Sequence, residues 1–346
     1  MESYRVMPAG THEILVGSGI AFRLPELLAA GSRPVGAPGR IALLTDRTVA
    51  GLYLARCQKA FADAGLDVRP IAIDGQENGK TLDAVRSVFE QMEDMSFGDS
   101  DRLVALGGGV VCDVAGFAAA GYRGGCPHVI LPTTLLSMVD SSMGGRCQLN
   151  FRGHKNLLSL PSAPALAVVD PSFLQTLPKR HLAAAMSEIA KFALLDDPSL
   201  LDLLEKVPFP AEEVIVRALA ARARLLGAAS GVPHEDSPLS LGHAVGHSIE
   251  SHFRFLRFLH GEAVALGLLA VCSSPGLRDL FGRLGLPVQL DGVTAETLVR
   301  RILRDYPGHA GTLRMVLLDR PGSYRVETVA APQAEGFLSA LLARIL

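Results

Sequence analysis

Residues 102–121 read RLVALGGGVVCDVAGFAAAG. An apolar run at 102–106 predicts a strand that stops at three glycines, and a helical pattern begins at Val110. Glycines let the backbone approach a phosphate closely, and a helix N-terminus offers unpaired N–H groups and the positive end of a dipole. This strand–turn–helix segment suits a pyrophosphate, although it lacks the GxGxxG spacing of the standard dinucleotide fingerprint. A tight turn without a ligand explains it equally well.

The flanking sequence continues the alternation. Apolar runs at residues 41–45, 68–73 and 128–131 predict further strands. A helical pattern at 50–64 separates the first two of these strands, and another at 81–95 lies between the strand at 68–73 and the strand at 102–106. Strands that alternate with helices predict a parallel sheet with helices on its faces.

The pattern changes beyond about residue 177. Helical periodicities dominate there, at residues 181–195, 210–229, 241–255 and 262–272, with one short strand at 315–318. We therefore expect an α/β domain with a Rossmann-like parallel sheet over residues 1–170 and a mainly α-helical domain over residues 171–346.

Composition excludes several classes of protein. The 346 residues carry a net charge of −2, which argues against nucleic acid as a partner, because that binding needs a basic face. No apolar run reaches the ~18 residues of a membrane span, and the apolar stretch at 263–272 predicts a buried helix. The N-terminus lacks a signal-peptide core. Five scattered cysteines favour reduced core residues in a cytoplasmic protein.

Histidines and a carboxylate suggest a metal centre. His243 and His247 are four residues apart and would share one helix face. His260 follows thirteen residues later, and Glu188 lies three residues before Lys191 in an earlier helical pattern. Such ligands from separate helices suit a catalytic zinc with one open position. Ten histidines also produce chance pairs, but the glycine directly before each of the first two histidines favours a metal site.

Polar residues gather after the expected strand at 128–131. Thr133 and Thr134 end that strand, where ligand crevices form in α/β sheets. Residues 140–146 read DSSMGGR and residues 150–156 read NFRGHKN. Two glycines beside an arginine, followed by a Lys-Asn pair, are typical of an anion-binding loop. A solvated basic loop is the plain alternative.

Together these segments resemble the sugar phosphate cyclases, the superfamily of 3-dehydroquinate synthase. The resemblance covers about residues 46–318 and rests on the order and spacing of GGGVVCDVAGF, LPTTLLSMVDSSMGG, GHKN, TLPKRH, SEIAK, LGHAVGHSIE and LHGEAVALG. It implies an NAD-binding α/β domain followed by a helical metal-binding domain, in a homodimer.

The resemblance also implies roles for single residues. Glu188, His243 and His260 would bind Zn²⁺, which Co²⁺ can often replace, and His247 would face the substrate. Arg123 would reach into the partner subunit's site. The residues expected around NAD are Asp46, Glu77, Lys80, Gly108, Gly109, Asp113, Thr133, Thr134, Phe173, Thr176 and Leu177. Those expected at the substrate are Asp140, Arg146, Lys155, Asn156, Lys191 and Arg222, with Lys191, His247, Asp140 and Arg146 as catalytic residues.

The implied reaction closes a seven-carbon sugar phosphate into a carbocycle with no net redox change. It proceeds by transient oxidation with NAD, elimination of phosphate, re-reduction and an intramolecular aldol step. The metal would polarise the oxygen of the oxidised carbon, and Lys191 would stabilise an alkoxide or transfer a proton.

Departures from the 3-dehydroquinate synthase pattern concern the substrate's head group. That enzyme has arginine and asparagine seven and three residues before the first histidine of GHxxGH, where this chain has Asp236 and Ser240. An aspartate there would repel a carboxylate by roughly a kcal/mol at close range. Where 3-dehydroquinate synthases have Asp-Lys-Lys near the C-terminus, this chain has Asp305-Tyr306-Pro307. Lysine is also usual where Arg146 and Arg222 stand.

Other segments point to a different cyclase. FRGHKN at residues 151–156 looks like the 2-epi-5-epi-valiolone synthases, which cyclise sedoheptulose 7-phosphate, a sugar without a carboxylate. Gly246-His247 instead follows the dehydroquinate synthase pattern. We therefore expect sedoheptulose 7-phosphate as substrate and cyclitol biosynthesis as the setting. The alternative is a divergent 3-dehydroquinate synthase acting on 3-deoxy-arabino-heptulosonate 7-phosphate.

Two more distant alternatives remain open. Iron-dependent or glycerol-type alcohol dehydrogenases share the architecture but need no phosphate site, which Arg146, Lys155 and Arg123 argue against. A catalytically degenerate homologue is disfavoured by the presence of Glu188 and Lys191 together with the histidines.

Overall fold

The computed structural model describes residues 5–8, 12–30, 39–229, 231–306 and 311–346. The chain divides into two compact units, Met1–Leu177 and Pro178–Leu346. The division falls after Leu177 rather than near residue 170, so Phe173 and Thr176 belong to the first unit. Pro307 lies outside the described residues.

Unit 1 is built on a seven-stranded sheet with the order β1-β2-β9-β6-β5-β3-β4. Strand β1 (Arg5–Pro8) is antiparallel to its neighbour, and the other six strands are parallel. These six are β2 (Glu13–Val16), β3 (Arg40–Asp46), β4 (Asp67–Ile73), β5 (Arg102–Gly107), β6 (His128–Pro132) and β9 (Leu166–Val169). Strands β5 and β6 are buried along their whole length, which explains why they are continuous apolar runs in the sequence.

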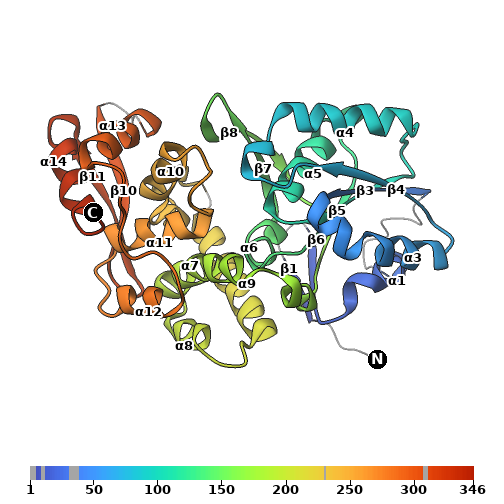
Figure 1. Cartoon of the computed structure of the whole chain (residues 1–346), viewed down its shortest axis with the longest axis horizontal. Coiled ribbons are helices and arrows are strands. Elements are labelled where there is room, and N and C mark those ends of the chain that lie inside the picture. The colour runs from blue at the N-terminus through green and yellow to red at the C-terminus, as the bar shows by residue number, and fades with distance from the viewer. Residues whose placement is uncertain (1–4, 9–11, 31–38, 230, 307–310) are drawn as a thin grey trace. The chain divides into compact units, whose positions relative to one another are not determined.

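Helices cover both faces of this sheet. They are α1 (Leu24–Ala30), α2 (Arg47–Val49), α3 (Ala55–Asp63), α4 (Leu82–Asp94), α5 (Gly109–Gly121) and α6 (Leu135–Val139). Figure 1 shows α4 and α5 on one side of β3–β5 and α1 and α3 on the other. The chain moves outward from β3 to β4 and then returns to β5 on the opposite side of β3. The carboxyl ends of β3 and β5 therefore flank the switch point where α/β sheets bind ligands.

A β-hairpin stands where the sequence predicted an anion-binding loop. Strands β7 (Gly145–Phe151) and β8 (His154–Ser162) pair antiparallel around the two-residue turn Arg152-Gly153. Both turn residues have positive φ, 50° and 78°, as tight two-residue hairpin turns require. The loop prediction was wrong about the backbone because Arg-Gly is not a strong hairpin signal.

Unit 2 is mainly helical, as the sequence predicted. Its helices are α7 (Lys179–Leu195), α8 (Leu201–Leu204), α9 (Ala211–Ala228), α10 (His243–His252), α11 (His260–Val271), α12 (Leu277–Arg283), α13 (Ala295–Asp305) and α14 (Ala331–Leu342). A hairpin of β10 (Thr312–Arg320) and β11 (Ser323–Ala330) adds a small sheet. Helix α11 is buried from Gly261 to Val271, which confirms the buried helix expected there and explains its apolar character on all sides.

Two further findings concern the cysteines and the lengths of the helices. None of the five cysteines forms a disulfide, and four of them are buried. Within the described ranges, no helix is both long and apolar enough to cross a membrane.

Candidate active site

The glycine turn lies at the carboxyl end of β5. A Cβ atom on Gly107 would come within 2.5 Å of Val111, so strand and helix pack too closely for a side chain there. Gly108 precedes α5 and provides no side-chain cap for its first N–H groups. A Cβ on Gly108 would also meet Thr134 at 3.2 Å. These uncapped groups at a helix start fit a pyrophosphate.

Other residues expected around NAD share this edge of the sheet. Thr45 is in register with Leu106 of β5, which brings Asp46 beside the glycine turn. The Asp46 carboxylate accepts hydrogen bonds from the N–H groups of Thr48 (2.8 Å) and Val49 (3.0 Å). From the next strand, the Thr133 N–H donates to the Gly107 carbonyl at 2.9 Å. Unit 1 thus brings a carboxylate, glycines and hydroxyl groups to one ligand-binding edge, which fits a dinucleotide.

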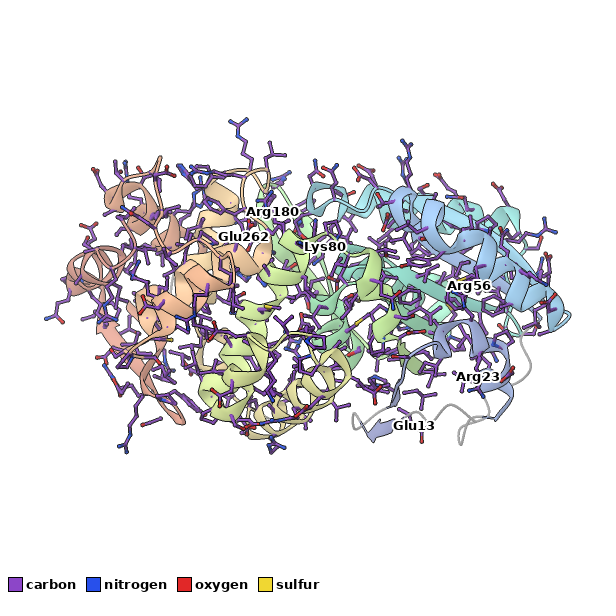
Figure 2. All side chains as sticks on the ribbon, turned by 60° about the horizontal axis from the view of Figure 1, so that its bottom comes forward. Glu13, Arg23, Arg56, Lys80, Arg180 and Glu262 are labelled. Atoms are coloured by element: carbon purple, nitrogen blue, oxygen red, sulfur yellow. The ribbon has the colours of Figure 1, made fainter. Side chains whose placement is uncertain are left out.

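Lys80, labelled in Figure 2, is the centre of a buried polar cluster. Its Nζ lies 2.6 Å from Oδ2 of Asp113 and donates to Oδ1 of Asn156 at 2.7 Å. Burial lowers the pKa of Lys80, but the carboxylates of Asp113, Glu77 and Asp140 outweigh burial and raise that pKa above its usual value. The ammonium is therefore protonated at neutral pH.

The β7–β8 hairpin is anchored to this cluster. The Asn150 side chain donates to both the carbonyl and the Oε1 of Glu77, each at 2.9 Å. The Gln148 N–H donates to Asp113 at 3.1 Å. The hairpin carries Asn156 into the cluster and presents the exposed Arg146 near its start. Arg146 makes no ion pair with any residue that the structure describes, so its charge is available to an anion.

The other residues of unit 1 that were expected at the site lie in two different places. Phe173 is buried with its ring 4.7 Å from that of Tyr53, and the Thr176 hydroxyl hydrogen-bonds the Tyr53 hydroxyl. Arg123 instead follows the far end of α5 and pairs with Glu93 at 3.2 Å. A thirteen-residue helix is about 20 Å long, so the structure does not bring Arg123 to the glycine turn of its own unit.

In unit 2, one carboxylate faces two imidazoles. Oε1 of the buried Glu188 lies 3.2 Å from Nε2 of His243 and 3.4 Å from Nε2 of His260. Two ligands of a tetrahedral zinc at ordinary bond lengths stand about 3.3 Å apart. Oε1 has no hydrogen-bond partner within the described residues, while the second carboxylate oxygen lies 2.5 Å from Nζ of Lys191. An orphaned, buried carboxylate oxygen at these distances fits a metal ion.

The protonation states also suit a metal. Burial and the Lys191 ammonium lower the pKa of His243 from 6.5 to about 4, so this imidazole is neutral at pH 7. Burial raises the pKa of Glu188, but Lys191 and His243 outweigh it and hold that pKa well below its usual value. Metal binding requires ionised carboxylates and neutral imidazoles.

Hydrogen bonds orient the two imidazoles. Nδ1 of His243 lies 3.2 Å from the Leu241 carbonyl, and Nδ1 of His260 lies 3.0 Å from the Glu250 carboxylate. Both partners only accept hydrogen bonds, so the proton of each ring lies on Nδ1 and the Nε2 lone pair faces Glu188.

His247 offers a second, overlapping triad. The ligand nitrogens of His243, His247 and His260 lie within 4.8 Å of one another. Nδ1 of His247 is 2.8 Å from the Tyr306 hydroxyl. We favour Glu188 over His247 as the third ligand, because Glu188 brings a negative charge and an unsatisfied oxygen.

Glycines bring the ligand-bearing helices together. A Cβ on Gly261, next to His260, would lie 1.8 Å from the Ala184 carbonyl of α7. A Cβ on Gly267 of α11 would lie 2.1 Å from the carbonyl of Gly242, the residue before His243. The backbones of α7, α10 and α11 therefore approach more closely than any larger residue permits. The glycines that flank the histidines in the sequence have this structural cause.

A pocket opens beside His243. Its lining residues are Glu235, Ser240, Gly242, His243, Ala244, Tyr306, Arg314, Met315 and Val316. Arg314 pairs with the buried Asp236 at 2.9 Å. The expectation of an unpaired aspartate that repels a carboxylate therefore needs correction, because Asp236 neutralises a neighbouring cation and is not itself among the lining residues. On α9, the Arg222 guanidinium stands 5.6 Å from the Phe192 ring, and Lys191 stands 5.2 Å from that ring.

The sequence did not reveal the residues that support the histidines. Glu250 lies seven residues after His243, on the helix face that carries His243 and His247, and this spacing was the available signal. Arg180 and Glu262 pair at 2.7 Å and lie side by side in Figure 2. Glu262 also accepts from the Leu259 N–H at 2.8 Å, which fixes the start of α11 at His260.

Comparisons with known proteins agree with this architecture. The chain matches the 3-dehydroquinate synthase N-terminal model over residues 70–184 and the C-terminal model over residues 185–306. It is 33% identical over 338 residues to the 3-dehydroquinate synthase of Synechococcus sp. (strain CC9605), covering 91% of this chain and 90% of that protein. It is 35% identical over 333 residues to the enzyme of that name from Azotobacter vinelandii (strain DJ / ATCC BAA-1303), covering 90% and 89%.

Solved structures share the fold. The 2-epi-5-epi-valiolone synthase ValA from Streptomyces hygroscopicus subsp. jinggangensis 5008, with NAD⁺ and Zn²⁺ bound, matches with a TM-score of 0.82 and 27% identity over 98% of this chain and 99% of that one. A 2-deoxy-scyllo-inosose synthase complexed with carbaglucose-6-phosphate, NAD⁺ and Co²⁺ matches with a TM-score of 0.84 and 20% identity, over 97% and 99%. The chain therefore belongs to the 3-dehydroquinate synthase family, within the sugar phosphate cyclase superfamily of phosphate-eliminating lyases.

Proposed function

We propose that this sugar phosphate cyclase converts sedoheptulose 7-phosphate into a carbocycle with loss of phosphate, using NAD and Zn²⁺ or Co²⁺. The likeness to ValA over nearly the whole chain supports NAD and zinc. The glycine turn of unit 1 and the Glu188, His243 and His260 cluster of unit 2 fit these two groups.

The observation that carries the choice of substrate is the ion pair between Asp236 and Arg314. A carboxylate in a partly buried site needs a cationic partner, and leaving it unpaired costs several kcal/mol. Among the described residues, Arg314 is the one cation that lines the pocket beside His243, and its charge is already neutralised by Asp236. A sugar with a neutral head group fits this pocket better than a keto acid.

The chain's own residues have defined tasks in this proposal. NAD supplies reversible hydride transfer when bound, and the metal supplies a Lewis acid. The amine of Lys191 lies 2.5 Å from the Glu188 carboxylate and 3.0 Å from the Leu239 carbonyl. In its protonated form it stabilises a developing alkoxide. Arg146, exposed on β7, is suited to the phosphate, and so is His247 if it donates from Nε2. Lys80 fixes Asn156 as a polar contact.

A homodimer in a cytoplasmic setting belongs to the same proposal. Arg123 lies at the end of α5 that is remote from the glycine turn, so a role at a phosphate is best explained by a partner subunit's site. The Arg123 side chain is 56% exposed, which leaves it accessible to a partner subunit.

A second candidate is a divergent 3-dehydroquinate synthase that acts on 3-deoxy-arabino-heptulosonate 7-phosphate. Curated relatives of that name at 33–35% identity over about 90% of the chain favour it.

The test is phosphate release measured with both sugars side by side. We expect release from sedoheptulose 7-phosphate and a kcat/KM for the keto acid that is lower by about tenfold or more. Efficient release from the keto acid alone would make the chain a divergent 3-dehydroquinate synthase.

Replacing Asp236 with asparagine should shift this preference. The change leaves the shape nearly unaltered but frees the Arg314 guanidinium for a carboxylate. We expect kcat/KM for the keto acid to rise about tenfold, the value of one charge-assisted hydrogen bond, with little change for sedoheptulose 7-phosphate. Asp319→Asn is the matched control, since it breaks the exposed pair with Arg325 on the same hairpin. An unchanged ratio between the two substrates would remove Asp236 from the account of specificity.

A further inference from the structure

The hydrogen bond between His247 and Tyr306 sets this histidine apart from its neighbours. Tyr306 follows directly after α13, which packs against α10, and its hydroxyl lies 2.8 Å from Nδ1 of His247. Burial, together with the charges of Asp305 and Glu250, raises the pKa of the Tyr306 phenol. The hydroxyl therefore carries its proton at neutral pH. A neutral phenol is a stronger donor than acceptor, and an imidazole nitrogen with a lone pair is a strong acceptor.

The partner of Nδ1 decides which ring nitrogen carries the proton in each of the three clustered histidines. The Leu241 carbonyl and the Glu250 carboxylate accept, so His243 and His260 are protonated on Nδ1 and keep a lone pair on Nε2. With the phenol as the donor, the Nδ1 lone pair of His247 is used and the proton of this ring lies on Nε2. An imidazole in that form cannot bind a cation through Nε2 but can donate from Nε2 to an anion.

We propose that Tyr306 is a positioning residue that holds His247 as the Nε2–H tautomer. Of the three clustered histidines, only His243 and His260 then serve as metal ligands, and His247 presents a hydrogen-bond donor to an anionic group. The identity of that anion as the substrate's phosphate rests on the proposed function. The tautomer itself does not, because it follows from the partners of the three rings.

The tautomer is read by long-range ¹H–¹⁵N NMR on metal-free protein labelled with ¹⁵N-histidine, with His247 assigned by its loss in His247→Gln. We expect His247 to be protonated on Nε2 in the unaltered protein, and His243 and His260 on Nδ1. In Tyr306→Phe, which keeps the ring and removes only the hydroxyl, His247 should become a mixture of tautomers. Tyr324→Phe, on the exposed hairpin, is the matched control and should change nothing.

The affinity for inorganic phosphate provides a second test, because it would not change if Tyr306 had a purely structural role. Inorganic phosphate should bind about fivefold more weakly to Tyr306→Phe than to the unaltered protein, the loss of one oriented hydrogen bond. In the His247→Gln background, adding Tyr306→Phe should cost no further affinity, because the glutamine amide donates without help from the phenol.

An Nδ1-protonated His247 in the unaltered protein, or an unchanged His247 spectrum in Tyr306→Phe, would overturn the proposal. Neither readout requires turnover, so the proposal is tested separately from the choice of sugar. Failure of phosphate release with both sugars would overturn the proposed function and leave the tautomer result intact.

Discussion

Replacing Glu188 with glutamine should remove the bound metal ion and lower the rate of phosphate release by about a thousandfold, the scale of losing a preorganised electrostatic contact. The substitution preserves shape but removes the negative charge between His243 and His260. It also leaves the Lys191 ammonium buried without its ion-pair partner. Metal content by elemental analysis and phosphate release after adding Zn²⁺ or Co²⁺ are the measurements.

The controls separate ligand loss from a general effect of charge. Glu205→Gln makes the same change in an exposed pair with Arg283 and should leave metal content and rate unchanged, because such pairs contribute little. His243→Ala and His260→Ala should lose metal as Glu188→Gln does. His247→Ala should keep the metal and lose activity. Full metal content in Glu188→Gln, with none in His247→Ala, would show that the three histidines form the metal site.

Replacing Gly261 with alanine should destabilise the helical unit by about 3 kcal/mol and lower its metal content. The new methyl carbon would lie 1.8 Å from the Ala184 carbonyl oxygen, a backbone atom that no side-chain movement can displace. Helix α7 and helix α11 must therefore move apart, at the upper end of the usual range for overpacking. That movement separates Glu188 from His260. Chemical denaturation and metal titration measure the two effects.

Gly336 offers the matched control. It lies on the exposed face of α14, and a Cβ there would meet nothing within 4 Å. Gly336→Ala should be neutral or stabilise the protein by about 0.5–1 kcal/mol, because alanine has less backbone conformational freedom than glycine in the unfolded chain. Equal stability of Gly261→Ala and Gly336→Ala would contradict the close approach of α7 and α11.

The sequence predicted the elements whose patterns are local. Strands β3, β5 and β6 are largely continuous apolar runs because both of their faces are buried, whereas the edge strand β4 is mostly exposed. The positions of all four strands were confirmed within a residue or two. In unit 2, periodicity predicted α7, α9, α10 and α11, but α8, α12, α13 and α14 were not predicted. The β7–β8 hairpin was missed because Arg152-Gly153 is a weak turn signal, and the residues that anchor the hairpin, Glu77 and Asp113, are far away in the sequence.

The site shows the same division between local and distant signals. Glu188, His243 and His260 come from three helices. Residue types and spacing suggested a metal centre among Glu188 and three histidines, but only the resemblance selected these three ligands and left out His247. The pairing of Asp236 with Arg314 was invisible in the sequence, because 78 positions separate the two residues (314 − 236) and nothing local indicates a partner. The same holds for Tyr306 and His247. Tertiary contacts of this kind decide charge and tautomer, and no periodicity encodes them.

The most direct test of the central claim follows phosphate and NADH together in one reaction with sedoheptulose 7-phosphate, NAD and Zn²⁺. A redox-neutral cyclase should release one phosphate for each carbocycle formed, with no accumulation of NADH and no requirement for added reductant. NADH that accumulates in step with consumed sugar, without release of phosphate, would contradict the account and identify a dehydrogenase on the same fold.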